Sequence, residues 1–151
     1  MPYRICKTFE IENGHMLSKH PDLCKFPHGH TRKIEFVLEV ESLDENQMVC
    51  DFKLVKKTMK NFLSSWDHAL CMNTDDPAFA DFQKRYGVRV IGFKSKDPTT
   101  EVMAKVIYDT FVKELADYKP DSNTPYLLRQ TVKVVKVRVW ETSSSWAEYS
   151  D

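Results

Sequence analysis

The sequence of 151 residues has no excess of either charge and no long apolar stretch. Lysine and arginine together number 22, as do aspartate and glutamate, so the formal net charge is zero with neutral histidines. This balance gives no electrostatic reason to expect binding to nucleic acid or to an anionic membrane surface. The apolar runs are far shorter than the ~20 residues that span a bilayer, and the first residues form no apolar signal segment. We therefore expect a cytoplasmic protein.

Cysteine is also scarce. The four cysteines are too few for a disulfide-stapled mini-domain and too unevenly spaced for paired CxxC zinc knuckles. We expect free thiols in a reducing compartment. Cys6, Cys50 and Cys71 are expected to be small apolar side chains of the interior, and Cys24 is treated separately below.

Hydrophobic residues make up 42% of the chain, which is enough for the core of one domain over residues 1–151. Alternating and β-branched patterns predict five strands, the strand from residue 33 to 41 having Ile34, Phe36, Leu38 and Val40 on one face. The predicted strands cover residues 3–11, 33–41, 88–93, 131–140 (with Val135, Val137 and Val139 on one face) and 146–149.

Apolar residues at helical spacing predict three helices. They cover residues 52–66 after an N-cap at Asp51, a short stretch after Asp76-Pro77 that buries Phe79, Phe82 and Tyr86 and ends at Gly87, and about 101–117 after a cap at Thr99 or Thr100. Two strand hairpins separated by helices favour an α+β layer with an antiparallel sheet.

Three of the five histidines form a pattern typical of a metal site. His28 and His30 are two residues apart, so an extended backbone points both rings to the same side. His15 lies thirteen residues before His28, where a hairpin brings it beside the pair. Three neutral imidazoles with an open fourth position are the ligand set of a catalytic zinc site. The alternative is three unrelated surface or capping histidines.

Cys24 stands four residues before His28 and has two interpretations. It is either a fourth zinc ligand, which closes the tetrahedron and makes the site structural, or a thiolate base activated by the nearby cation. The spacing alone does not decide between them.

Polar residues elsewhere complete the set of candidates. Asp67-His68 follows the first long helix and can act as a proton relay only at a helix end or in a loop, because adjacent helical residues do not face each other. Glu141 ends the valine-rich strand, where a carboxylate can accept two parallel hydrogen bonds from an amidine-like edge. Solvated or capping residues are the alternative in each case.

Taken together, these residues resemble the 6-pyruvoyl-tetrahydropterin synthase family, including its bacterial branch, the 6-carboxy-tetrahydropterin synthases of the queuosine pathway. Thr31-Arg32 departs from the pattern, since an aromatic residue is common after the second histidine of the pair. The matching segments run along nearly the whole chain: Phe9 to His15, Cys24 to His30, Met48 to Phe52, Asp67-His68, Pro98 to Glu101 and Glu141-Thr142.

The resemblance implies a T-fold, in which an antiparallel four-stranded sheet has helices on one face. It also implies that three subunits close a barrel and that two trimers stack into a homohexamer. It further implies Zn²⁺ on the three histidines, with Cys24 as catalytic base rather than ligand. Asp67 and His68 would act across a subunit interface. Glu141, with Thr99 or Thr100, would anchor a pterin.

The implied reaction is that of a zinc-dependent lyase that converts 7,8-dihydroneopterin triphosphate into 6-carboxy-5,6,7,8-tetrahydropterin. One alternative is a sibling reaction, either 6-pyruvoyl-tetrahydropterin synthesis or aldolase cleavage of the side chain. Another, from a different class, is a non-catalytic pterin-binding or structural-zinc oligomer in which Cys24 joins the histidines.

Overall fold

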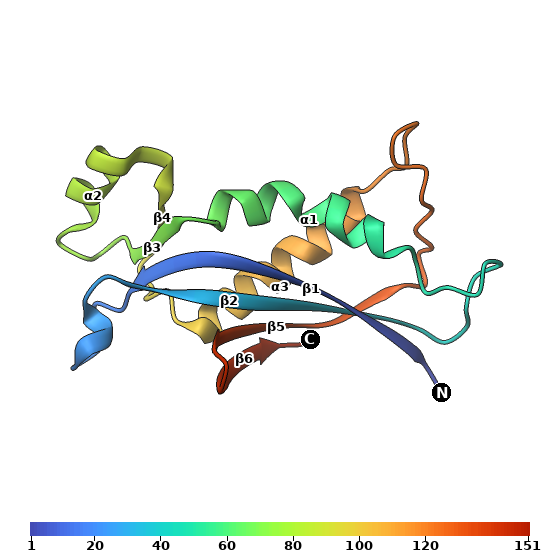
Figure 1. The fold of residues 1–151 in the computed structure, drawn as a ribbon, viewed down its shortest axis with the longest axis horizontal. Helices are drawn as coiled ribbons and strands as arrows, with labels where there is room; N and C mark the ends of the chain where they lie inside the picture. Colours follow the sequence, from blue (N-terminus) through green and yellow to red (C-terminus); the bar gives the residue numbers. More distant parts are fainter.

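A computed structural model describes residues 1–151 as a curled β-sheet with two long helices, α1 and α3, packed on one of its faces (Figure 1). In chain order the elements are β1 (Tyr3–Met16), β2 (His28–Val40), α1 (Phe52–Trp66), β3 (Ala69–Asn73), α2 (Phe79–Tyr86), β4 (Val90–Phe93), α3 (Thr100–Asp117), β5 (Lys133–Thr142) and β6 (Ser145–Tyr149). Short 3₁₀ helices lie at Leu23–Lys25 and Gly87–Arg89. None of the helices combines the length and apolar character that crossing a bilayer requires.

The sheet is mixed and has six strands in the order β4-β3-β1-β2-β5-β6, which corrects the prediction of four antiparallel strands. The predicted antiparallel set is present as β1, β2, β5 and β6, but β3 and β4 extend it in parallel beyond β1. The prediction missed β3 because its five residues are almost all buried and show no alternation. The sheet of one chain ends at β4 and β6 and does not close into a barrel.

The first hairpin is longer than the sequence pattern indicates. β1 continues to Met16 and β2 begins at His28, so all three candidate histidines lie in strands, not beside them. Gly14 and Gly29 face each other across this hairpin, and the apolar part of both strands lies farther from the turn. Apolar alternation does not extend to the polar end of the hairpin, so the sequence pattern predicts strands that stop short of the turn.

The predicted helices are confirmed, with their caps. Asp51 accepts a hydrogen bond from the Lys53 amide (2.8 Å) and begins α1, and Thr99 does the same for the Val102 amide (3.1 Å) at α3. Gly87 ends α2 with φ of 60°, a conformation that glycine adopts without strain. Tyr86 was expected to point inward and instead is 53% exposed.

The core lies between the sheet and the two long helices. Phe36 of β2 meets Phe111 of α3 edge to face, with ring centroids 4.7 Å apart. On β5, a bulge opposite Val37 and Leu38 shifts the register, so Val134 pairs with Leu38 and packs against the core. Simple alternation placed Val135 on that face, and the one-residue insertion is the reason it failed.

The other face of the sheet is highly charged over β2, β5 and β6. Helix α2 packs only on its β3–β4 end, where Phe79 and Phe82 contact a small cluster of Met16, Met72 and Val90. Glu35, Arg138 and Glu148 form a row across β2, β5 and β6, with Arg138 3.6 Å from Glu35 and 2.7 Å from Glu148. Arg138 also covers the ring of Trp146. Apolar burial is therefore concentrated on the helix side, where the candidate site also lies.

Candidate metal centre

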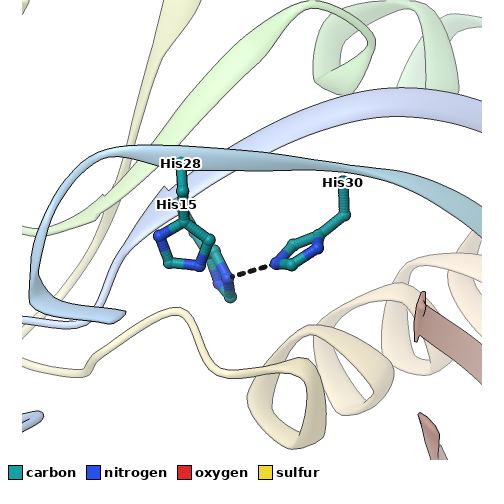
Figure 2. Close-up of side chains that lie close together, drawn as sticks. All are labelled: His15, His28 and His30. Carbon is teal, nitrogen blue, oxygen red and sulfur yellow. Dashed lines mark hydrogen bonds between the residues drawn. The ribbon is translucent and has the colours of Figure 1, made fainter. Parts of the chain in front are cut away.

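The end of the β1–β2 hairpin brings the three histidines together. His15 and His28 are direct cross-strand partners, and His30 follows on the same side of β2. Figure 2 shows the three rings extending from the hairpin toward the start of α3. One potential ligand atom from each residue lies within 4.8 Å of the others, and no cysteine, aspartate or glutamate joins this group.

Two backbone carbonyls fix the tautomers of these rings. Nδ1 of His15 donates to the Pro98 carbonyl and Nδ1 of His28 to the Phe26 carbonyl, both at 2.8 Å. Because a carbonyl oxygen only accepts, each Nδ1 carries the proton and each Nε2 keeps a free lone pair. This second hydrogen bond is the arrangement that orients histidine ligands in metal sites.

The donor set fits a tetrahedral metal. Nε2 of His15 and Nε2 of His30 lie 3.2 Å apart. Two nitrogens at 2.0–2.1 Å from a tetrahedral zinc ion are separated by about 3.4 Å. Three nitrogen donors and no thiolate leave a fourth position for another ligand.

Burial favours the neutral form of two of these rings in the metal-free protein. Burial chiefly, with the positive charge of Arg32 in addition, lowers the pKa of His15 to about 4, although its hydrogen bond to Pro98 acts in the opposite direction. The pKa of His30 is lowered as well, again first by burial and then by Arg32. At neutral pH both rings are therefore in the form that binds metal.

A hydrogen-bonded chain connects Arg32 to Glu141 beside the histidines. Nη1 of Arg32 donates to Oγ1 of Thr100 (3.1 Å), and that hydroxyl donates to Oε1 of Glu141 (3.0 Å). Oε1 of Glu141 is also 3.7 Å from Nε2 of His15 and 3.8 Å from Nε2 of His30. The structure thus brings Glu141 and Thr100 to the centre.

Thr99 and Thr100, which the sequence left as equivalent candidates for binding the pterin, make different contacts. The hydroxyl of Thr99 caps α3, whereas the hydroxyl of Thr100 contacts Glu141. Arg32 was not a candidate from the sequence. Its position gave one signal, since a strand residue two places after His30 starts on the same side of the sheet, although this does not fix where the guanidinium ends.

Cys24 lies in the loop between β1 and β2, within the 3₁₀ helix, and is half-buried. The loop is attached to the segment before α3 by Asp97. Its carboxylate accepts hydrogen bonds from the Ser18 amide and hydroxyl, the Lys19 amide and the Asn73 side chain, at 2.7 to 3.1 Å. Although burial alone would raise it, these bonds hold the pKa of Asp97 below its ordinary value.

Asp67 and His68 form a pair at the end of α1. His68 has a φ of 59°, which turns its ring back so that Nδ1 lies 3.1 Å from Oδ2 of Asp67. The other carboxylate oxygen accepts from the Glu12 amide at 2.8 Å, and this bond chiefly lowers the pKa of Asp67. The His68 side chain is 72% exposed and, within one chain, the pair does not join the histidine group.

His68 lines an open groove of about 630 Å³. Glu12, His30, Thr31 and Arg89 are among its other lining residues. Arg89 donates to the Asp67 carbonyl at 2.9 Å and so holds the 3₁₀ helix after α2 beside the pair.

Comparison with known proteins places the chain in a family. The profile described as 6-pyruvoyl tetrahydropterin synthase matches residues 4–151. The 6-carboxy-5,6,7,8-tetrahydropterin synthase of Aquifex aeolicus is 32% identical over 169 aligned residues, covering 100% of this chain and 99% of that protein. The enzyme of the same name from Rickettsia conorii is 24% identical, covering 94% of this chain and 96% of its own.

Solved structures agree on the fold. An uncharacterized protein from Wolinella succinogenes superposes with a TM-score of 0.75 at 22% identity, covering 100% of this chain and 99% of the other. The 6-pyruvoyl tetrahydropterin synthase of Plasmodium vivax gives 0.72 at 16% identity, covering 100% and 98%. With the family profile covering nearly every residue, the chain belongs to the 6-pyruvoyl tetrahydropterin synthase family, whose members are pterin synthase lyases.

Proposed function

We propose that the protein is a zinc-dependent 6-carboxy-5,6,7,8-tetrahydropterin synthase acting on 7,8-dihydroneopterin triphosphate. The observation that carries the proposal is the group of three histidine donors with Glu141 beside it. The name shared by the relatives from Aquifex and Rickettsia favours the carboxy product over its siblings.

His15, His28 and His30 would hold the metal. When bound, zinc would act as a Lewis acid on the hydroxyls of the substrate side chain and make the neighbouring protons easier to remove. The Pro98 and Phe26 carbonyls orient two of the rings before any ion arrives, which lowers the reorganisation that binding requires.

Glu141 would anchor the pterin. One oxygen of its carboxylate accepts a hydrogen bond from Thr100, and the Glu141 side chain is 35% exposed. The other oxygen is therefore available to the 2-amino-4-oxo edge of the ring. A pair of parallel hydrogen bonds to a carboxylate fixes both position and rotation of a planar ligand.

Cys24 would accept a proton from the substrate side chain. It is absent from the set of donors around the three histidines, which supports the role of a base over that of a ligand. The loop that carries it is tied by Asp97 to the segment holding Pro98, so Cys24 and His15 are positioned by the same anchor.

Asp67 and His68 would exchange a second proton. Within one chain His68 lines an open groove and the pair does not join the histidine group, which favours a second copy that presents the pair to another subunit's histidines. We therefore include in the proposal a trimer that closes the open sheet into a barrel, and a hexamer of two such trimers.

The test is incubation of purified protein of known zinc content with 7,8-dihydroneopterin triphosphate, followed by mass spectrometry of the pterins. Formation of 6-carboxytetrahydropterin together with acetaldehyde is the expected result. A pyruvoyl or hydroxymethyl pterin would reassign the reaction within the family. Stoichiometric zinc without turnover would contradict the synthase proposal for this substrate.

Replacement of Cys24 separates the catalytic from the structural interpretation. The Cys24→Ala protein is expected to retain zinc and lose turnover. Loss of zinc in this variant would instead support a closed structural site, and Cys6→Ala, at an exposed thiol on β1, is the matched control.

A further inference from the structure

Arg32 is a buried cation without a direct anionic partner. Its side chain is 1% exposed, Nε has no hydrogen-bond acceptor, and no carboxylate oxygen lies within 4.0 Å of the guanidinium. Burying a charge in this way is unfavourable by several kcal/mol unless other interactions offset it. A fully buried arginine whose Nε lacks a hydrogen-bond partner therefore indicates a functional role at the adjacent site.

The guanidinium lies against the ring of His15. Nη2 is 3.3 Å from Nδ1 and 3.5 Å from Nε2 of that ring. Nδ1 carries the proton that it donates to Pro98, so it offers no lone pair to Nη2. The His15 ring is thus held between two contacts, the Pro98 carbonyl and the Arg32 guanidinium.

The same side chain determines the direction of the Thr100 hydroxyl. Arginine has only donors, so Oγ1 of Thr100 must accept from Nη1. A hydroxyl has one hydrogen, and here it points to Oε1 of Glu141. Arg32 therefore attracts the Glu141 carboxylate in two ways, by its charge and through the oriented hydroxyl.

Without such an attraction, a rotation of the Glu141 side chain would bring it to the metal. Oε1 is 3.7 and 3.8 Å from the donor nitrogens of His15 and His30, close to the separation of about 3.4 Å between ligands of a tetrahedral zinc ion. Glu141 lies outside the group that includes His28, so its carboxylate reaches the fourth position only by turning toward His28. A carboxylate there would occupy the position that the substrate needs.

We propose that Arg32 is a positioning residue that keeps Glu141 out of the metal's coordination sphere and directed toward the ligand. The inference rests on the proposed metal site but on no particular pterin reaction. It makes Arg32, through Thr100, the residue that keeps the fourth coordination position open.

The experiment measures metal binding alone. Wild type, Glu141→Gln, Arg32→Met and the double variant are stripped of metal and titrated with Co²⁺ while the visible spectrum is recorded, and Zn²⁺ affinity is measured by chelator competition. Arg4→Met, at an exposed arginine of β1, is the matched control. Removal of an incompletely paired buried charge is often neutral or stabilising, so Arg32→Met is expected to fold.

Wild type and Glu141→Gln are expected to share one Co²⁺ spectrum, since Glu141 is not a ligand. Arg32→Met is expected to show a changed spectrum and a Zn²⁺ Kd lower by roughly tenfold, the lower end of outer-shell effects. Adding Glu141→Gln to it should restore the wild-type spectrum.

Three results would overturn the proposal. They are a spectrum unchanged by Arg32→Met, a spectrum changed by Glu141→Gln alone, and an affinity gain in Arg32→Met that persists in the double variant. Arg32→Gln is the second neutral variant. If neither variant folds, as judged by circular dichroism, Arg32 serves folding and the proposal also falls. A wild-type protein that binds neither ion would instead refute the metal site of the proposed function.

Discussion

Nδ1 of His15 donates a hydrogen bond to the carbonyl oxygen of Pro98 at 2.8 Å, and this contact joins the end of the first hairpin to the start of α3. The bond determines which nitrogen of the ring is protonated and leaves Nε2 facing His28 and His30. A single buried contact thereby connects the packing of the helix on the sheet with the chemistry of the site.

Replacing His15 by alanine is expected to abolish tight metal binding. Only two donors would remain, and loss of a ligand should exceed the roughly 10–100-fold effect of outer-shell changes. Zinc affinity by chelator competition is the measurement, with His20→Ala as the control. His20 accepts from the Asp22 amide in the loop and lies outside the donor group. Equal affinity in both variants would contradict the assignment of His15 as a ligand.

The metal-free protein is expected to lose stability as the pH falls from about 6.5 to about 4. The pKa of His15 in the folded state, about 4, is below the ordinary histidine value, so the unfolded chain binds more protons in this interval. As the pH is lowered through this interval, protonation linked to His15 should reduce the free energy of unfolding by roughly 3 kcal/mol at most. Urea denaturation in chelator at several pH values measures the effect.

The matched variant for this prediction is His15→Gln, which keeps a polar side chain but cannot take up a proton. Its stability should depend less on pH between about 4 and 6.5 than that of the wild type. Parallel curves for the two proteins would show that His15 does not titrate as its burial implies.

Periodicity predicted the helices of this fold well because their caps and apolar spacing are local features. Asp51, Thr99 and Gly87 act at the predicted helix ends, where each residue's own backbone or side chain sets the boundary. β3 and the register shift opposite Leu38 were not predictable in this way. A fully buried strand lacks alternation, and a bulge is specified by pairing partners distant in the chain.

The histidine donors were predictable from residue type and spacing, since two positions two apart on a strand must share a face. Their third member needed the hairpin register, which pairs His15 with His28. The role of Arg32 was not predicted from the sequence, because no local pattern indicates that its guanidinium stays buried at the site instead of reaching solvent.

Asp97 is expected to stabilise the loop that carries Cys24. Replacement by alanine removes four hydrogen bonds to a carboxylate and leaves the Ser18 and Lys19 amides without these partners. We expect a loss of about 2 kcal/mol in the free energy of unfolding, since bonds to charged groups contribute about 1.5–3 kcal/mol each when buried and less when partly exposed. Hydrogen exchange over residues 17–27 should also accelerate.

The control for this variant is Asp109→Ala on α3. Asp109 is exposed and pairs only with Lys105 one helical turn away, a solvent-screened contact that contributes little to stability. If the two substitutions have the same effect on stability and on exchange in the loop, Asp97 is not the anchor inferred from its contacts.

The neighbouring threonines at the start of α3 provide a paired test of structure against function. Thr99→Val removes the cap of α3 and should lower the free energy of unfolding by about 1 kcal/mol, with little effect on substrate binding. Thr100→Val removes the hydroxyl that holds Glu141 and, if Glu141 anchors the pterin, should raise KM several-fold more than Thr99→Val does. Denaturation curves and steady-state kinetics on both proteins separate the effects, because the cap acts on the helix and the second hydroxyl acts on the site. A KM raised equally by both substitutions would mean that Thr100 acts only through the helix.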